Sequence, residues 1–432
     1  MESLKKMGHC TALCITNYLN FLDTEGGLWA CGDNEYIQCG LPGGEDNEWS
    51  YDTPTKLPQI PLVKEMWFGP TSTIFLDQEG YMWAFGDNAL IAVCSSPPNS
   101  SESAASKCQI KLNVEAISMT NVHTLILDTD NKVWGIGYNW EGQIGRVEKK
   151  RTYYTLEQIQ PLPPIQQVFA GSLRSLFIDH QGFVWGCGSN KEGMLGIGSQ
   201  ANTIGPPTKL PELQNVVSIC LGQTHNLFLD SEGNVWSCGS NLNGQLGQGD
   251  KFQNCTVPLK LSGLPRILAA FARANQSILL DENRELWAFG GNQHGGMGCG
   301  FDAENIFLPT KIPNIQGETV SLGIKSTYIL DCSGCVWSAG LNTSGELGLG
   351  DYENRKAFEK IENLPTMTSL RAGISFLVLF DNDGKVWTCG LNQDGRLGQR
   401  HTKNVPSPQI IDLPSVVPYS YSKKVATKSA RK

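Results

Sequence analysis

The sequence is poor in charge and has no long apolar run. Only 18% of its 432 residues are charged and 40% are hydrophobic, which excludes a disordered polyelectrolyte. No stretch of about 18 apolar residues occurs, so the sequence predicts no transmembrane helix and no membrane insertion. The formal net charge of −8 argues against non-specific binding of nucleic acid by the body of the chain.

Motifs for metals, phosphates and catalysis are lacking as well. Among the 14 cysteines, Cys332 and Cys335 form a CxxC pair, but no second pair stands at zinc-binding spacing. No Ser-His-Asp or HExxH arrangement is recognisable, and the glycine-rich segments lack the strand–loop–helix context of a phosphate loop. We therefore predict a protein that is not an enzyme, with no catalytic, cofactor-binding or metal site and no cofactor. The cysteines are interpreted as thiols in a reducing cytoplasm or nucleus, which predicts an intracellular location.

Glycine, in contrast, is abundant, and tryptophan reveals a repeat. The chain has 47 glycines, roughly 11% of its residues against a usual ~7%. A tryptophan recurs every 50–54 residues, at Trp29, Trp83, Trp134, Trp185, Trp236, Trp287, Trp337 and Trp387. In every unit an aspartate stands six residues before the tryptophan, a glycine three after it and an asparagine five after it. Four positions held in eight units define eight sequence repeats.

Each repeat reads as four short strands. The unit from Val216 to Pro265 contains four apolar runs of about five to seven residues, which is strand length and too short for a helix. Gly233 follows Asp230 in a tight hairpin turn that favours a positive φ. In the sixth unit Arg284 takes this place and follows Asn283, which suggests a turn shifted by one residue.

The pattern predicts an all-β chain, a β-propeller of four-stranded antiparallel blades, because stacked blades cover sheet faces that one sheet cannot bury alone. We predict eight blades in a single domain over residues 1–421, with seven blades plus an irregular element as the alternative. The expected blades are about 8–62, 63–113, 114–165, 166–215, 216–265, 266–318, 319–367 and 368–415. A first-strand pattern at 10–15 recurs at 416–421, and one of the two is expected to close the ring. Residues 422–432 are expected to form a basic disordered tail.

The constant residues are interpreted as scaffold. The tryptophans are expected in the core, together with the residues two positions later, which include Cys31, Cys187, Cys238 and Cys389. The repeated aspartates and asparagines are expected to cap turns. Five residues before the aspartate the residue varies, and it is histidine in two units, His123 and His225. These histidines are expected to be hydrogen-bonded within their blades rather than catalytic.

The segments VWSCGSNLNGQLGQGD, VWSAGLNTSGELGLGD and VWTCGLNQDGRLGQ resemble the repeat of the regulator of chromosome condensation family. That family's hallmark is an aromatic-x-x-Gly-x-Asn-x-x-Gly-x-Leu-Gly segment, and the resemblance covers essentially residues 8–421. Units one and two depart from it, with Ile37 and Ile91 in place of a glycine and Cys94 in place of the last one. The resemblance implies a propeller, usually of seven blades, with looser loops in these two units.

Two functions follow from this resemblance. The first is a non-catalytic platform or adaptor whose loop faces bind proteins. The alternative is guanine-nucleotide exchange on a Ran-like small GTPase, the activity of the family's founding member, which uses a β-wedge inserted in a blade. The even spacing leaves little room for such a wedge, so we favour the platform. We expect a monomer with protein partners, in the cytoplasm or nucleus, and a nucleic-acid or chromatin contact only through the basic segment 423–432.

Overall fold

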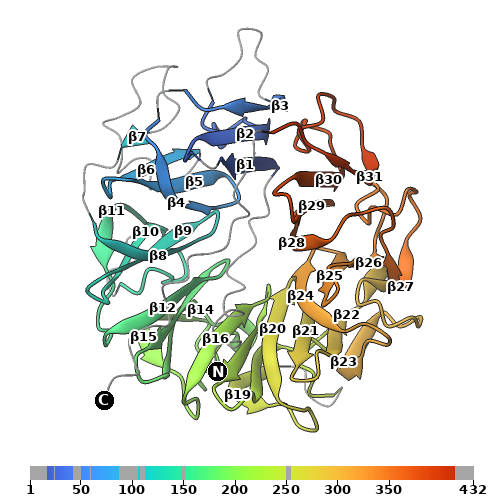
Figure 1. The fold of residues 1–432 in the computed structure, drawn as a ribbon. Helices are drawn as coiled ribbons and strands as arrows, with labels where there is room; N and C mark the ends of the chain where they lie inside the picture. Colours follow the sequence, from blue (N-terminus) through green and yellow to red (C-terminus); the bar gives the residue numbers. More distant parts are fainter. Residues whose placement is uncertain are drawn as a thin grey trace, which may run out of the picture.

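Eight β-sheets are arranged around a ring in the computed structural model (Figure 1). The structure describes residues 17–23, 25–41, 50–58, 60–86, 106–107, 112–146, 151–249 and 254–413. The fold is an eight-bladed β-propeller, which confirms the predicted class and blade number, so the seven-blade alternative is wrong. No helix within the described ranges is both long and apolar enough to cross a membrane.

The first blade has three described strands, and the other seven have four. The first three blades contain β1 (Tyr18–Leu22), β2 (Leu28–Asp33) and β3 (Ser50–Lys56); β4 (Val63–Phe68), β5 (Ser72–Asp77), β6 (Met82–Gly86) and β7 (Ser106–Lys107); and β8 (Val114–Met119), β9 (His123–Asp128), β10 (Val133–Tyr138) and β11 (Thr152–Gln158). The fourth and fifth contain β12 (Ile165–Ala170), β13 (Arg174–Asp179), β14 (Val184–Ser189) and β15 (Thr203–Lys209); and β16 (Val216–Leu221), β17 (His225–Asp230), β18 (Val235–Ser240) and β19 (Asn254–Lys260).

The last three blades follow the same plan. They contain β20 (Ile267–Arg273), β21 (Gln276–Asp281), β22 (Leu286–Gly291) and β23 (Asn305–Lys311); β24 (Gly317–Leu322), β25 (Ser326–Asp331), β26 (Val336–Gly340) and β27 (Arg355–Lys360); and β28 (Met367–Ala372), β29 (Phe376–Asp381), β30 (Val386–Gly390) and β31 (Val405–Ile410). Two short 3₁₀ turns, η1 (Lys191–Gly193) and η2 (Gln293–Gly295), lie in loops between third and fourth strands. Strands within each blade follow sequence order and are antiparallel.

The glycine three residues after each tryptophan permits an irregularity in the third strand. Gly239 has φ +106°, and the register between β18 and β19 shifts between Ser237 and this residue. A Cβ atom here would lie 2.3 Å from the carbonyl oxygen of Thr224, which no side chain tolerates without a backbone shift. The equivalent glycine has a positive φ in all eight blades, which explains why the position is invariant along the chain.

The hairpin turns also agree with the sequence pattern, with one correction. Gly233 has φ +86°, as expected for its turn. Arg284 has φ +66° and occupies the same position in the sixth blade, so the turn is not shifted by one residue. Its guanidinium contacts the carboxylate of Glu318 at 3.0 Å, a half-exposed ion pair that holds the side chain on the surface.

Neighbouring blades are joined by one recurring backbone hydrogen bond. The loop that follows the third strand donates an N–H to a carbonyl in the fourth strand of the next blade, as from Gly249 to Phe307 at 2.9 Å. The same bond joins the fourth to the fifth, the sixth to the seventh and the seventh to the eighth blade. It recurs from Arg400 of the eighth blade to Asp52 of the first at 2.8 Å. The junction between the eighth and first blades is therefore closed by the same contact that joins the fourth to eighth blades to one another.

The two expected closing strands, at 10–15 and 416–421, and the tail 422–432 lie outside the described residues. Within the described chain, apolar packing completes the junction between the eighth and first blades. Phe21 and Cys31 of the first blade share a buried cluster with Phe376 and Leu397 of the eighth. β1 corresponds to the second strand of the other blades, because its residues pair with β2 as β5 does with β6.

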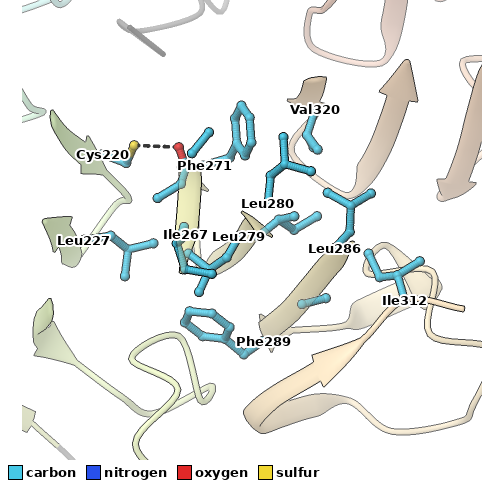
Figure 2. Close-up of a cluster of buried hydrophobic side chains, with 14 of the residues drawn as sticks. Cys220, Leu227, Ile267, Phe271, Leu279, Leu280, Leu286, Phe289, Ile312 and Val320 are labelled. Carbon is cyan, nitrogen blue, oxygen red and sulfur yellow. Dashed lines mark hydrogen bonds between the residues drawn. The ribbon is translucent and has the colours of Figure 1, made fainter. Parts of the chain in front are cut away.

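The largest hydrophobic cluster lies where the fifth, sixth and seventh blades meet (Figure 2). Phe271 and Leu279 of the sixth blade pack there with Leu227 of the fifth and Val320 of the seventh. The Cys220 thiol donates to the carbonyl oxygen of Ala270 at 2.9 Å, drawn as the dashed line in Figure 2. Burial of this kind, at about 25 cal/mol per Å² of apolar surface, holds the blades side by side.

The repeated cysteines and tryptophans differ in how deeply they are buried. Cys31, Cys187, Cys238 and Cys389 are fully buried, which confirms their place in the core. The eight tryptophans are only half-buried and pack against the edges of the apolar clusters, so their interpretation as core residues is wrong in part. Each tryptophan donates its indole N–H to the carboxylate of the repeated aspartate, as Trp236 does to Asp230, which is buried.

Candidate functional site

In every blade the carboxylate of the repeated aspartate accepts hydrogen bonds from groups of its own blade. In the fifth blade, Oδ1 of Asp230 accepts hydrogen bonds from the backbone N–H groups of Glu232 and Asn234 at 3.0 and 2.9 Å. Its Oδ2 accepts the indole N–H of Trp236 at 3.2 Å. The same aspartate-to-indole bond is present in all eight blades. The expected turn capping is confirmed, and the bond to tryptophan is an additional function of the carboxylate.

The repeated asparagine organises the loop after the third strand. Oδ1 of Asn241 accepts the backbone N–H of Leu246 at 3.0 Å, and its Nδ2 donates to the carbonyl oxygen of Gly249 at 2.8 Å. Asn34, Asn190, Asn292, Asn342 and Asn392 make the same pair of contacts with their own loops. These amides are buried and saturated by backbone, so they are not available for acid–base chemistry.

The variable position ahead of the aspartate lies between blades. His123 is fully buried, and its Nε2 lies 2.9 Å from Oγ of Ser175 in the fourth blade. His225 makes the same 2.9 Å contact with Ser277 of the sixth blade. The expectation of bonds within a blade is therefore wrong for His225 and only partly confirmed for His123, whose Nδ1 also lies 3.4 Å from Oγ1 of Thr120 in its own blade. Through Nε2 both side chains join one blade to the next. Burial lowers the pKa of both imidazoles to about 3, so they are neutral at pH 7.

Arg174 occupies this variable position in the fourth blade, and its guanidinium is fully buried. Its Nη2 donates to the carbonyl oxygens of Gly222 and His225 at 2.8 and 3.0 Å, and Nη1 donates to that of Gln223 at 3.0 Å. Nε and Nη2 both donate to Oδ1 of Asn226 at 3.1 and 2.8 Å. All these acceptors are neutral and belong to the fifth blade. Burial lowers the pKa of this guanidinium to about 10, which leaves it charged at pH 7.

Glu346 is a buried carboxylate at a position where three of the other blades carry glutamine. Its Oε2 accepts the backbone N–H of Ser344 at 2.7 Å. Oε1 of Gln38, Gln143 and Gln245 accepts the equivalent N–H in the first, third and fifth blades. Burial raises the pKa of Glu346, because the ionised form loses hydration.

This substitution pattern predicts that Glu346→Gln stabilises the protein at neutral pH. The pKa of Glu346 is higher in the folded chain than its ordinary value of 4.5. Protonated Glu346 therefore contributes stability that is fully present below about pH 4.5 and is lost as the pH rises. We expect a rise in melting temperature of about 2 °C at pH 7 that shrinks towards pH 4.5. The reverse change, Gln245→Glu, serves as the matched control and should lower the melting temperature at pH 7. A Glu346→Gln protein that melts below wild type at pH 7 would contradict this account.

The CxxC pair lies in the hairpin between β25 and β26. Cys332 is exposed and Cys335 is half-buried, and both are free thiols. The Cys332 thiol donates to the carbonyl oxygen of Gly317 at 3.6 Å, and burial raises its pKa, which disfavours a reactive thiolate. Within the described ranges, no three His, Cys, Asp or Glu side chains are grouped so that they could hold a metal ion.

Exposed apolar side chains gather on one face of the ring. We call this the loop face: it carries the turns between first and second strands and the loops between third and fourth strands, which the antiparallel order brings to the same end of every blade. Eight of the thirteen exposed large hydrophobic residues lie there: Tyr36, Ile37, Tyr138, Trp140, Leu242, Phe301, Ile324 and Tyr352. The opposite face, formed by the other connections, has only Leu62 among the described residues.

The loop face contains an aromatic pair and a small polar cavity. The rings of Tyr138 and Trp140 stack with centroids 4.4 Å apart, and Trp140 is 56% exposed. The cavity, of about 270 Å³, lies between the fourth and fifth blades and is lined by Asn190, Asn202, Asn254 and Thr256. Glu192 is its only charged lining residue, so the cavity lacks a nucleophile with a paired base.

Comparison with known proteins agrees with this geometry. Residues 181–229, 232–280 and 383–426 match the Regulator of chromosome condensation (RCC1) repeat, and residues 216–245 match a second model of that repeat. The human Probable E3 ubiquitin-protein ligase HERC6 is 30% identical over 263 residues, which span 57% of this chain but only 25% of the ligase. The guanine nucleotide exchange factor SRM1 of Saccharomyces cerevisiae is 26% identical over 303 residues, 59% of this chain and 63% of SRM1.

A solved structure shares the fold. The crystal structure of Prp20p from Saccharomyces cerevisiae, described with its binding properties to Gsp1p and histones, superposes with a TM-score of 0.63. The match covers 83% of this chain and 92% of Prp20p at 20% sequence identity. At this identity the likeness establishes the propeller fold, and the site must be argued from the residues of this chain.

Proposed function

Because this chain carries RCC1 repeats on an eight-bladed propeller, we propose that it is a non-catalytic platform for protein–protein interaction. The observation that carries the proposal is the one-sided distribution of exposed apolar side chains on the loop face. Solvated apolar groups at loop ends supply binding energy once a partner covers them. The repeated polar residues, in contrast, are occupied by scaffold hydrogen bonds and offer no acid–base or nucleophilic constellation.

The test compares the two faces in the native cell. Trp140→Ser and Leu242→Ser remove exposed apolar groups from the loop face, and Leu62→Ser is the matched change on the opposite face. Partners crosslinked to the full chain and identified by mass spectrometry should be lost with the loop-face variants and retained with Leu62→Ser. Partners that are lost only with Leu62→Ser would refute the loop face as the binding surface.

The second candidate is guanine-nucleotide exchange, supported by the similarity to SRM1. Exchange needs a shaped surface that stabilises the nucleotide-free GTPase rather than a catalytic side-chain cluster. The discriminating measurement is release of fluorescent GDP from a Ran-like GTPase with this protein in catalytic amounts. The platform proposal expects no acceleration. Acceleration by about a hundredfold, roughly 2.7 kcal/mol of barrier lowering, would favour exchange instead. The predicted contact of segment 423–432 with nucleic acid lies outside the described residues and stays a prediction.

A further inference from the structure

The outer edge of the third blade lacks the protection found on the other blades. The fourth strand of a blade exposes unpaired edge groups, which proline and charge normally guard against added strands. β3, β15, β19, β23 and β31 each contain proline, and β27 has Arg355, Lys356, Glu359 and Lys360 among its six residues. β7 is only two residues long. β11, with the sequence TYYTLEQ, has neither a proline nor a lysine or arginine.

Two positions of the fourth strand distinguish the third blade from most of the others. Each repeat tryptophan pairs with a residue of the fourth strand, and this residue is lysine in six blades: Lys56, Lys107, Lys209, Lys260, Lys311 and Lys360. It is Gln158 in the third blade and Ile410 in the eighth, whose fourth strand contains two prolines. Two residues earlier, four of those blades have proline at Pro54, Pro207, Pro258 and Pro309, whereas the third blade has Leu156. Proline has no backbone N–H, so its presence in other blades shows that the sheet does not use an N–H at this position. In β11 Leu156 retains this N–H, which is therefore available to an added strand.

Exposed aromatic side chains concentrate on the same blade. Of the six exposed aromatic residues in the described chain, three belong to the third blade: Tyr138, Trp140 and Tyr154. Tyr154 lies on β11 and is 63% exposed. Tyr138 pairs with Thr152 at the beginning of β11, so the stacked Tyr138–Trp140 pair stands at the loop-face end of the same edge. Aromatic side chains of this kind are common anchors in protein interfaces.

The side chain at the beginning of this edge is cationic. Arg151 directly precedes β11 and is exposed. The nearby carboxylates already have cationic partners, because Glu157 lies 3.7 Å from Arg146 and Glu141 lies 3.2 Å from Lys191. A complementary ligand therefore carries negative charge close to Arg151.

We propose that β11 binds an extended, acidic peptide segment of a partner protein, which adds to the third blade as a fifth strand. Main-chain hydrogen bonds to the edge supply the register, an apolar side chain of the peptide covers Trp140, and a carboxylate pairs with Arg151. This proposal rests on the proposed function of the chain as an interaction platform. It assigns the partner segment to the ring's outer edge, where the described residues of the other blades are guarded.

The test uses the full chain and a displayed library of random peptides of about twelve residues. Selected peptides should be enriched in Asp and Glu and should lose at least about tenfold in affinity on Leu156→Pro, because proline removes an edge N–H. Trp140→Ala and Arg151→Ala should each weaken them as well. The matched control is Leu308→Pro in β23, which reproduces the two adjacent prolines of β15 on another blade and should leave affinity unchanged.

Hydrogen exchange on the wild-type chain provides a second readout that does not depend on a variant folding. Bound peptide should slow exchange of the backbone amides in Thr152–Gln158 and leave those of β23 unaffected. Peptides that bind Leu156→Pro as tightly as wild type, or protect only the loop face, would overturn the edge proposal and leave the platform standing. A wild-type dimer that Leu156→Pro converts to a monomer would identify a second copy as the occupant and also overturn it. Recovery of no binding peptide would overturn the edge proposal, while the crosslinking comparison of the two faces still decides the platform.

Discussion

Arg174→Leu is expected to lower the free energy of unfolding by about 1–3 kcal/mol, the range for leaving a buried hydrogen-bonding group unsatisfied. The guanidinium donates to three carbonyl oxygens and to Asn226 of the neighbouring blade, at distances of 2.8–3.1 Å. Leucine fills part of the space but removes the donor to Asn226 and to the carbonyl oxygens of Gly222 and Gln223, while the carbonyl oxygen of His225 keeps the N–H of Gly222. Phe376 stands at the same position in the eighth blade, so an apolar residue there is compatible with the fold itself.

Urea unfolding at pH 7 measures this effect, and two variants complete the experiment. Arg174→Lys should also destabilise, because one ammonium group cannot reproduce the fork of the guanidinium. Arg146→Leu is the control: Arg146 is a partly exposed partner of Glu157, so its loss should change stability by less than about 1 kcal/mol. If Arg174→Leu proves as mild as this control, the guanidinium does not contribute to the junction between the fourth and fifth blades.

Acidification from pH 7 to pH 5 is expected to cost about 4 kcal/mol of stability through two histidines. Burial lowers the pKa of His123 and of His225 to about 3, whereas an ordinary histidine titrates at 6.5. The unfolded chain therefore takes up two protons below pH 6.5 that the folded chain refuses until about pH 3. The stability contributed by the neutral imidazoles is present above pH 6.5 and is lost as the pH falls, by about 2 kcal/mol for each histidine at pH 5.

The double variant His123→Gln, His225→Gln isolates this contribution. Glutamine already occupies the equivalent position in the sixth blade at Gln276, so the substitution has a precedent within the ring. Urea titrations at pH 7 and pH 5 should show that the variant loses much less stability on acidification than wild type. His180→Gln, which replaces an exposed imidazole, should retain the wild-type pH dependence. Equal acid sensitivity in wild type and the double variant would show that neither buried histidine is responsible.

The eight-bladed ring was predictable because every blade repeats the same local requirements. A glycine with positive φ at the bulge, an aspartate at the hairpin and an asparagine in the loop each act within about ten residues of the tryptophan. Such contacts leave a periodic mark on the sequence. Ile37 shows how far the pattern tolerates departure, since it adopts φ +60° where six other blades have glycine. Its loop nevertheless keeps the hydrogen bond that the backbone N–H of Cys39 donates to Oδ1 of Asn34.

Contacts between blades were not predictable in the same way. His123 and Ser175 are 52 residues apart, and only the curvature of the ring brings them together. The half-buried state of the tryptophans likewise reflects their packing at the edges of the apolar clusters, which the repeat pattern does not show. The loop face could not be identified from the sequence, because the exposure of Trp140 and Leu242 reflects packing around them rather than residue type. The edge of the third blade could be compared with the others only through the strand register, which shows that Leu156 takes the position of a proline in several other blades.

The hydrogen bond from the N–H of Arg400 to the carbonyl oxygen of Asp52 joins the eighth blade to the first, so the ring of blades has no free end. In a linear solenoid the terminal unit has one neighbour and can fray without disturbing the rest. Here each blade has a neighbour on both sides, so opening any one junction deprives two blades of support at once. When a partner binds one blade, both neighbouring blades resist its displacement. The loops of the other blades therefore keep their positions.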